Sequence, residues 1–166
     1  MSTPVINEPR PALYRGLTER LVSEQLVSSA GAAEIAEQAR TQSKTLIQEL
    51  LDGNHIDSAA LAAIVSEEYG VPLFNLTPMV REHFPLDLVP QSLIRKHKAL
   101  PLYRRGNRLF VAIADPTNTS ALAEFKFATG IATDSVVVEQ KLLLETISEV
   151  IAKQDEVFDG DIADFA

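Results

Sequence analysis

The sequence contains no cysteine, and other signals of specialised chemistry or targeting are missing as well. Without cysteine the chain cannot form a disulfide framework, a thiolate metal site or a cysteine nucleophile, and this fits a reducing compartment. The first eleven residues hold three prolines and no apolar run, so they do not resemble a signal peptide. No stretch reaches the roughly 18 apolar residues that a membrane-spanning helix needs. These absences predict a cytoplasmic protein.

Basic residues are in the minority. The chain has 15 Lys and Arg against 23 Asp and Glu, which gives a net charge of -8. Non-specific nucleic-acid binding needs the opposite sign to neutralise phosphates, so it is excluded as the main activity. With 166 residues, 46% of them hydrophobic, the chain is long enough to bury a core as one domain or two small lobes.

Sequence motifs of catalysis are also absent. Lys44-Thr45 lacks the preceding glycines of a phosphate-binding GxxxxGK[ST] loop, and neither GxGxxG nor HExxH occurs. Glu67-Glu68 fits a solvated helix face better than acid–base chemistry, because adjacent residues of a helix point in different directions. Turn or surface positions are expected for the three histidines, which lack metal-ligand spacing: His55, His83 and His97. We therefore predict no catalytic residue, no metal site and no cofactor in this sequence.

Apolar residues recur at helical intervals through residues 12–70 and predict four helices. Ser28 is expected to cap the second helix, Gly53-Asn54 to end the third, and Asp57 to cap the fourth. A shift of 29 residues superimposes the first helix pair on the second, aligning Leu17 with Leu46, Leu21 with Leu50, Ser29-Ala30 with Ser58-Ala59, Ala33 with Ala62 and Ile35 with Ile64. Unless this match is a coincidence of an alanine-rich stretch, each pair supplies one half of a shared core.

The pattern changes after Gly70. Two β-prone runs, Ala99–Tyr103 and Arg108–Ile113, flank Gly106-Asn107 and predict a hairpin. A helix ending at Gly130, a third strand at 135–138 and a final helix reaching residue 151 follow. The predicted fold class is α+β, with an N-terminal four-helix duplicated lobe followed by a small β-β-α-β-α lobe.

The predicted organisation has four parts. A proline-containing disordered arm occupies 1–11, the helical subdomain 12–76, the α+β subdomain 77–153, and an acidic linker 154–166. The linker is inferred because residues 155–166 hold five acidic residues and no basic ones. Between the two subdomains, the proline-rich connection from Thr77 to Pro90 is expected to form a partly ordered joint.

Two groups of side chains are candidates for contacts with other molecules. Apolar residues around the first helix are candidate protein anchors, with burial in the core as the alternative for each: Leu13, Tyr14, Leu17, Leu26 and Val27. Six cations fall within fourteen residues that contain no acid: Arg95, Lys96, Lys98, Arg104, Arg105 and Arg108. They form a candidate site for an anion or an acidic partner. The alternative is a solvated hairpin tip and helix end, where basic residues suit the helix dipole.

Two stretches carry a family resemblance. Leu100–Asn118, followed by Phe125-Lys-Phe-Ala-Thr-Gly, resembles the second N-terminal subdomain of type II secretion and type IV pilus assembly ATPases. Residues 68–76, Glu-Tyr-Gly-Val-Pro-Leu-Phe-Asn-Leu, close a half that is similar to the helical subdomain preceding it. The likeness spans 12–153 and is strongest to the regulatory MshE-N or type II secretion E-like region of pilus extension motors of the PilB type. In that family the Walker motifs, ATP, Mg and the hexamer-forming parts belong to a C-terminal region, which this sequence lacks.

Some members of that family bind cyclic-di-GMP through a duplicated 24-residue motif with a five-residue spacer, each copy opening Arg-Leu-Gly and closing on Gln. The repeat has the same period, with copies at 16–39 and 45–68. The signature is replaced: the opening arginine by Gly16 and Thr45, the third-position glycine by Thr18 and Ile47, the inner glycine by Gln25 and Asn54, and the closing glutamine by Ala39 and Glu68. Lost cations and glycines argue against direct dinucleotide binding.

The resemblance therefore implies a non-catalytic module that docks other proteins. The expected partner is a PilZ-type adaptor, through which cyclic-di-GMP would act indirectly, or an inner-membrane platform or cytoplasmic ring component. The full-length protein would be a cytoplasmic hexameric ATPase held at the inner face of the cell membrane by partners, without inserting into it. Two alternatives stay open: a direct cyclic-di-GMP sensor with a divergent binding mode, and an enzyme with an unrecognised site.

Overall fold

The computed structural model describes residues 16–164, and its first part is a lobe of four helices. These are α1 (Leu17–Ser23), α2 (Ser29–Thr41), α3 (Leu46–Asp52) and α4 (Ser58–Tyr69). The predicted caps are confirmed: the side chain of Ser28 accepts a hydrogen bond from Gly31 N, and that of Asp57 accepts one from Ala60 N. Leu13, in the predicted first helix, lies outside the described residues.

The repeat seen in the sequence is also a repeat of backbone structure. Displaced by 29 residues, the bounds of α1 coincide with those of α3, and α2 and α4 begin at equivalent residues. The turn between the helices is also shared, because Gln25 and Asn54 occupy equivalent positions and both have positive φ, 59° and 50°. Leu21 with Leu50, and Ile35 with Ile64, are buried in one core, as predicted.

The connection between the two lobes is ordered and contributes to packing. It contains two short 3₁₀ turns, η1 (Arg81–His83) and η2 (Leu86–Leu88). Arg81 Nη1 donates to the carbonyl oxygens of Leu76 and Met79 at 2.7 and 3.0 Å. Leu76 and Phe84 are buried in the core of the second lobe. Because Leu76 packs in the core of the second lobe, that lobe includes residues before 77.

The second lobe has the predicted β-β-α-β-α order, preceded by α5 (Gln91–His97). Strands β1 (Leu100–Arg105) and β2 (Arg108–Ile113) form the antiparallel hairpin, and β3 (Ala132–Val137) pairs with β2 in parallel. The crossover helix α6 (Thr119–Thr129) returns the chain to the start of β3, as a parallel connection requires. The predicted α+β class is confirmed.

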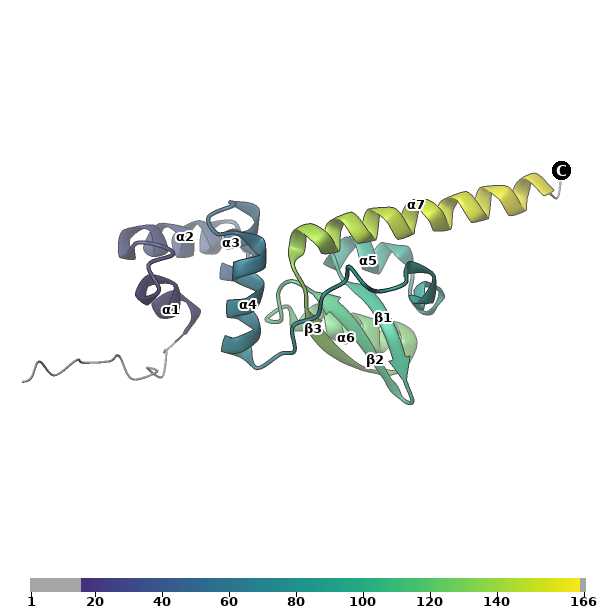
Figure 1. The fold of residues 1–166 in the computed structure, drawn as a ribbon, viewed down its shortest axis with the longest axis horizontal. Coiled ribbons are helices and arrows are strands. Elements are labelled where there is room, and N and C mark those ends of the chain that lie inside the picture. Colours follow the sequence, from purple (N-terminus) through teal and green to yellow (C-terminus); the bar gives the residue numbers. More distant parts are fainter. Residues whose placement is uncertain (1–15, 165–166) are drawn as a thin grey trace, which may run out of the picture.

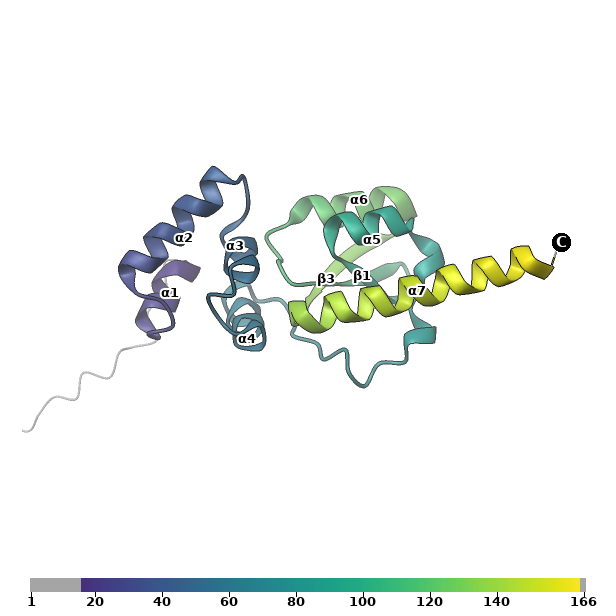
Figure 2. The same cartoon turned by 90° about the horizontal axis from the view of Figure 1, so that it is seen from above.

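The last helix, α7 (Gln140–Asp164), is longer than predicted. It lies along the second lobe and continues past it (Figures 1 and 2). Leu143, Ile147, Val150 and Ile151 bury one stripe, whereas residues 155–157 are exposed. The stretch predicted as an acidic linker is therefore helical up to Asp164. Once a helix is nucleated by packing, each added residue gains one backbone hydrogen bond, so an apolar stripe is not needed for the extension. In the described part of the chain no helix is long and apolar enough to cross a bilayer.

Candidate functional site

A partly buried hydrogen-bond network joins the second copy of the repeat to the α+β lobe. Thr45 caps α3, and its hydroxyl accepts from Gln48 N at 3.0 Å while donating to Asp115 Oδ2 at 2.5 Å. The other oxygen of Asp115 accepts from the backbone N–H of Thr117 at 2.9 Å and from its hydroxyl. Both oxygens of this buried carboxylate are thus satisfied, one of them from across the lobe boundary.

Further contacts reinforce this junction. Ser58, the first residue of α4, donates from Oγ to Glu139 Oε1 at 2.7 Å, directly before α7. Val137 from β3 is buried in the helical-lobe core, and its N–H donates to Pro72 O at 2.8 Å while its carbonyl accepts from Phe74 N at 2.8 Å. The two lobes therefore share both apolar packing and polar pairs.

Charged residues of α3 lie at the same boundary. Asp52 accepts from Lys44 Nζ at 3.0 Å and from Gln48 Nε2 at 2.7 Å. Burial would raise the pKa of Asp52, but these two hydrogen bonds and the nearby Lys44 and Lys98 charges lower it below its ordinary value. Since Lys98 follows α5, the carboxylate of Asp52 also interacts electrostatically with the second lobe.

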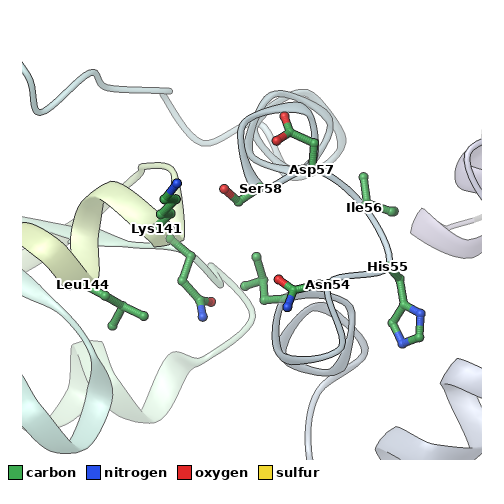
Figure 3. Close-up of a pocket in the computed structure, with 9 residues that line it drawn as sticks. Asn54, His55, Ile56, Asp57, Ser58, Lys141 and Leu144 are labelled. Carbon is green, nitrogen blue, oxygen red and sulfur yellow. The ribbon is translucent and has the colours of Figure 1, made fainter.

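A hollow of about 450 Å³ opens between the α3–α4 loop and the first turn of α7 (Figure 3). Asn54 and Ser58 lie on its helical-lobe side and Lys141 and Leu144 on the side of α7, whereas the His55 ring points away from α7. The hollow has the volume of a small-molecule site, and its lining is mixed polar and apolar.

The predicted apolar anchors divide into three groups. Leu13 and Tyr14 lie outside the described residues. Leu17 is only 3% exposed and belongs to the helical core, so it cannot serve as a surface anchor in this fold. Leu26 is 40% exposed, and Val27 is partly buried against the core. The 3.6-residue spacing placed Leu17 correctly on an apolar face but could not tell a core face from a docking face.

The six predicted cations do not form one surface. Arg95, Lys96 and Lys98 lie at the end of α5, before β1 begins, whereas Arg104, Arg105 and Arg108 flank the hairpin turn at its other end. A six-residue strand separates the groups by about 20 Å. Three of the cations are paired with carboxylates: Arg95 with Asp155 at 3.8 Å, Lys96 with Glu124 at 2.9 Å, and Arg108 with Asp134 at 2.5 Å.

Comparisons with known proteins agree with this architecture. The MshEN domain matches residues 69–157, more than half of the chain. This chain belongs to the MshEN domain family. It is 34% identical over 149 residues to the type IV pilus assembly ATPase PilB of Pseudomonas aeruginosa, covering 86% of this chain and 26% of that protein. PilB of Myxococcus xanthus is 30% identical over 151 residues, with 89% and 27% covered. The chain thus spans about a quarter of the length of these relatives.

Solved structures show the same fold as this MshEN chain. A structure of MshE with cdg has a TM-score of 0.63 at 20% identity, covering 82% of this chain and 99% of that one. The N-terminal domain of XpsE has a TM-score of 0.64 at 18% identity, covering 78% and 90%. The MshE structure matches 82% of this chain, whereas the family model matches only residues 69–157. The structural similarity therefore includes helices of the repeat as well as the α+β lobe.

Several repeat positions at which the resemblance leads us to expect a ligand signature have contacts within the fold of this chain. At the opening position of the second copy, Thr45 binds Asp115, and at the third position Ile47 is buried in the core. At the closing positions Ala39 is buried, and Glu68 lies 3.9 Å from Arg20 Nη1. The sequence did not reveal the contact of Thr45 with Asp115 or that of Glu68 with Arg20, because the partners are distant along the chain.

Arg20 occupies the fifth position of the first copy and joins the two ends of the helical lobe. From α1 it reaches Glu67 near the end of α4, and it binds Glu24 Oε1 at 2.9 Å. Hydrogen bonding to Glu67 is the main cause that raises the pKa of Arg20, against the effect of burial. Arg20 therefore links the first helix of the lobe to the last.

Among residues 16–157, whose side chains the structure describes, no cluster of three or more His, Asp or Glu has metal-binding geometry. His97 is the most enclosed of the three histidines, with Nε2 3.2 Å from Glu124 Oε2. His55 folds back over Gly53, where an added Cβ would lie 2.3 Å from His55 Nε2. The interactions of both rings are therefore with neighbouring parts of the fold.

Proposed function

We propose that this chain is a non-catalytic docking region of a type IV pilus assembly ATPase, one that recruits a PilZ-type adaptor or an inner-membrane platform protein. The proposal is supported by the contacts at the expected signature positions: Thr45 binds Asp115, Ile47 is buried in the core, and Glu68 lies 3.9 Å from Arg20 Nη1. In this proposal ATP, Mg and the hexamer belong to the remaining three quarters of a PilB-length protein, held by its partners at the inner face of the cell membrane.

The first copy of the repeat is the favoured docking face for this partner. It lies at the end of the molecule away from the α+β lobe (Figures 1 and 2). Only Ala32, Ile35 and Ala39 of α2 are buried, and Leu26 is exposed in the turn before that helix. Leu26 is next to Val27 in the chain, so a partner that binds this end could contact both predicted anchors.

A titration of the chain with a purified PilZ-type adaptor from the same cell tests the proposal. We expect a complex with a dissociation constant of about 1 μM or tighter. Leu26→Asp should weaken it at least about tenfold, because a charge would be buried in the interface. Val157→Asp places the same charge at an exposed apolar position of α7 and should leave binding unchanged. Absence of binding to the adaptor and to the cytoplasmic part of the platform protein would refute the proposal.

The second candidate function is direct sensing of cyclic-di-GMP. Two observations favour it: the described structure of MshE is one with cdg, and the hollow beside Asn54 and Lys141 is large enough for part of a dinucleotide. Calorimetric titration of the chain distinguishes the candidates. Heat with a stoichiometry of one, abolished by Lys141→Glu, would establish the sensor, and silence at about millimolar ligand would end it.

A further inference from the structure

Phe127 on α6 is the most exposed large apolar side chain of the described residues, at 93%. Two positions earlier on the same helix, Phe125 is fully buried in the core. Residues two apart on a helix point in different directions, so α6 needs only Phe125 for packing, and the fold gives no account of Phe127. An aromatic ring held in water is unfavourable, and such rings are common anchors of protein interfaces.

The strand register places Phe127 at a particular end of the sheet. Helix α6 ends at Thr129 and β3 begins at Ala132, which pairs with Arg108 of β2, which in turn pairs with Arg105 of β1. The end of α6 therefore lies at the hairpin-turn end of the sheet. The other end, with Val137 and Asp115, faces the helical lobe, so the turn end is the side of the α+β lobe directed away from that lobe (Figure 1).

This surface is basic in an otherwise acidic chain. We define the turn-end surface as residues 104–108 and 126–134. It contains four cations, Arg104, Arg105, Arg108 and Lys126, and among these residues Asp134 is the one acid. Arg108 is paired with that acid, Arg104 donates to Gly106 O at 3.0 Å, and Arg105 and Lys126 are exposed. Within the described residues, Arg104, Arg105 and Lys126 have no carboxylate partner, and they lie at the end of the sheet where Phe127, Ala128 and Ala132 are exposed.

We infer that the turn-end surface docks a second protein, one that presents an apolar pocket rimmed by Asp and Glu side chains. Phe127 would fill the pocket, while Arg104, Arg105 and Lys126 would face the acidic rim. This inference rests on the proposed docking function and assigns it a surface distinct from the first copy of the repeat. Of the two groups of predicted cations, the one at the hairpin turn therefore lies at the same end of the sheet as an exposed apolar side chain.

Other occupants fit this surface less well. Stable attachment to an anionic bilayer needs a broad apolar face or a larger basic cluster, and this surface offers one aromatic side chain. The net charge of -8 also disfavours binding to an anionic bilayer. A second copy of the chain would bring the same net charge and repel at long range. Complementary charge therefore favours a different, acidic protein.

Site-specific photocrosslinking in cells tests the inference with the full-length protein. A benzophenone amino acid replaces Phe127, and in the control it replaces Ser120, which lies seven residues earlier on the same face of α6 and is also exposed. We expect the yield at 127 to exceed that at 120 by about tenfold, as for a buried anchor against a peripheral position. The crosslinked peptide, identified by mass spectrometry, should come from another protein and contain Asp or Glu beside apolar residues.

A charge exchange then decides whether the contact is electrostatically specific. Arg105→Glu should reduce the crosslink, Arg95→Glu at the other end of β1 should not, and Lys in place of a carboxylate in the identified peptide should restore it. With that protein purified, Phe127→Ser should weaken binding about 30-fold. Equal yields at 127 and 120, a lipid adduct, or a crosslink within this chain or to a second copy would overturn the inference. If the adaptor titration still succeeds, the docking function survives that failure.

Discussion

Removing the Thr45 hydroxyl is expected to weaken both α3 and the junction between the lobes. Thr45→Val keeps the shape of the side chain but loses the cap of Gln48 N and the bond to Asp115. The lost cap costs about 1 kcal/mol. The lost hydrogen bond to a buried carboxylate costs about another 1.5 kcal/mol. This is the lower end of the range for hydrogen bonds to charged groups, because Thr117 still binds the other oxygen of Asp115. We therefore expect the free energy of unfolding to fall by about 2.5 kcal/mol.

The chain provides a matched control for this prediction. Ser28 caps α2, the second helix of the first pair, and its hydroxyl accepts from Gly31 N in an exposed setting. Ser28→Ala should therefore cost about 1 kcal/mol, and the difference from Thr45→Val isolates the bond between lobes. Urea unfolding followed by circular dichroism measures both. If the two variants lose the same stability, the contact with Asp115 contributes nothing and the reasoning is refuted.

Three further predictions concern single positions. Phe125→Ala should destabilise the chain by about 4 kcal/mol and Phe127→Ala by less than about 0.5 kcal/mol, measured by the same unfolding assay, because only the first ring is buried. Gln25→Gly should raise stability by about 0.5 kcal/mol, since a positive φ of 59° favours glycine, and a loss in thermal denaturation would contradict this. The folded-state pKa of Asp52 is lowered, so its stabilisation is present above the ordinary value of 3.8 and is lost as pH falls through the folded pKa. The Asp52→Asn variant should therefore lose less stability than the original chain as the pH falls below about 4. If the free energy of unfolding depends on acid pH in the same way in both, Asp52 does not contribute this stabilisation.

The local features of the fold were predictable because they depend on neighbouring residues. Caps such as Ser28 and Asp57 satisfy amides three residues ahead, and the hairpin follows from Gly106-Asn107 between two β-prone runs. The contact of Thr45 with Asp115 was not predictable, because 70 residues separate them and neither side chain has a signature of its own. The exposure of Phe127 was hidden for a similar reason: with Phe125 it reads as one apolar pair, and only the packing of α6 separates the two rings.

The two copies of the repeat differ in burial and in their contacts with the α+β lobe. Equivalent helices α2 and α4 begin at the same repeat position, but Ala33 and Ala36 of α2 are exposed where Ala62 and Val65 of α4 are buried. The second copy gains this burial within the assembled two-lobe fold, and its opening residue there is Thr45, which binds Asp115. An arginine at position 45 could not accept the Gln48 amide as the threonine hydroxyl does. Thr45 therefore has a role at the lobe junction that an arginine could not fill in the same way. At the equivalent position of the first copy, Gly16 has a φ of 132°, which an L side chain rarely adopts, so an arginine there would strain the backbone.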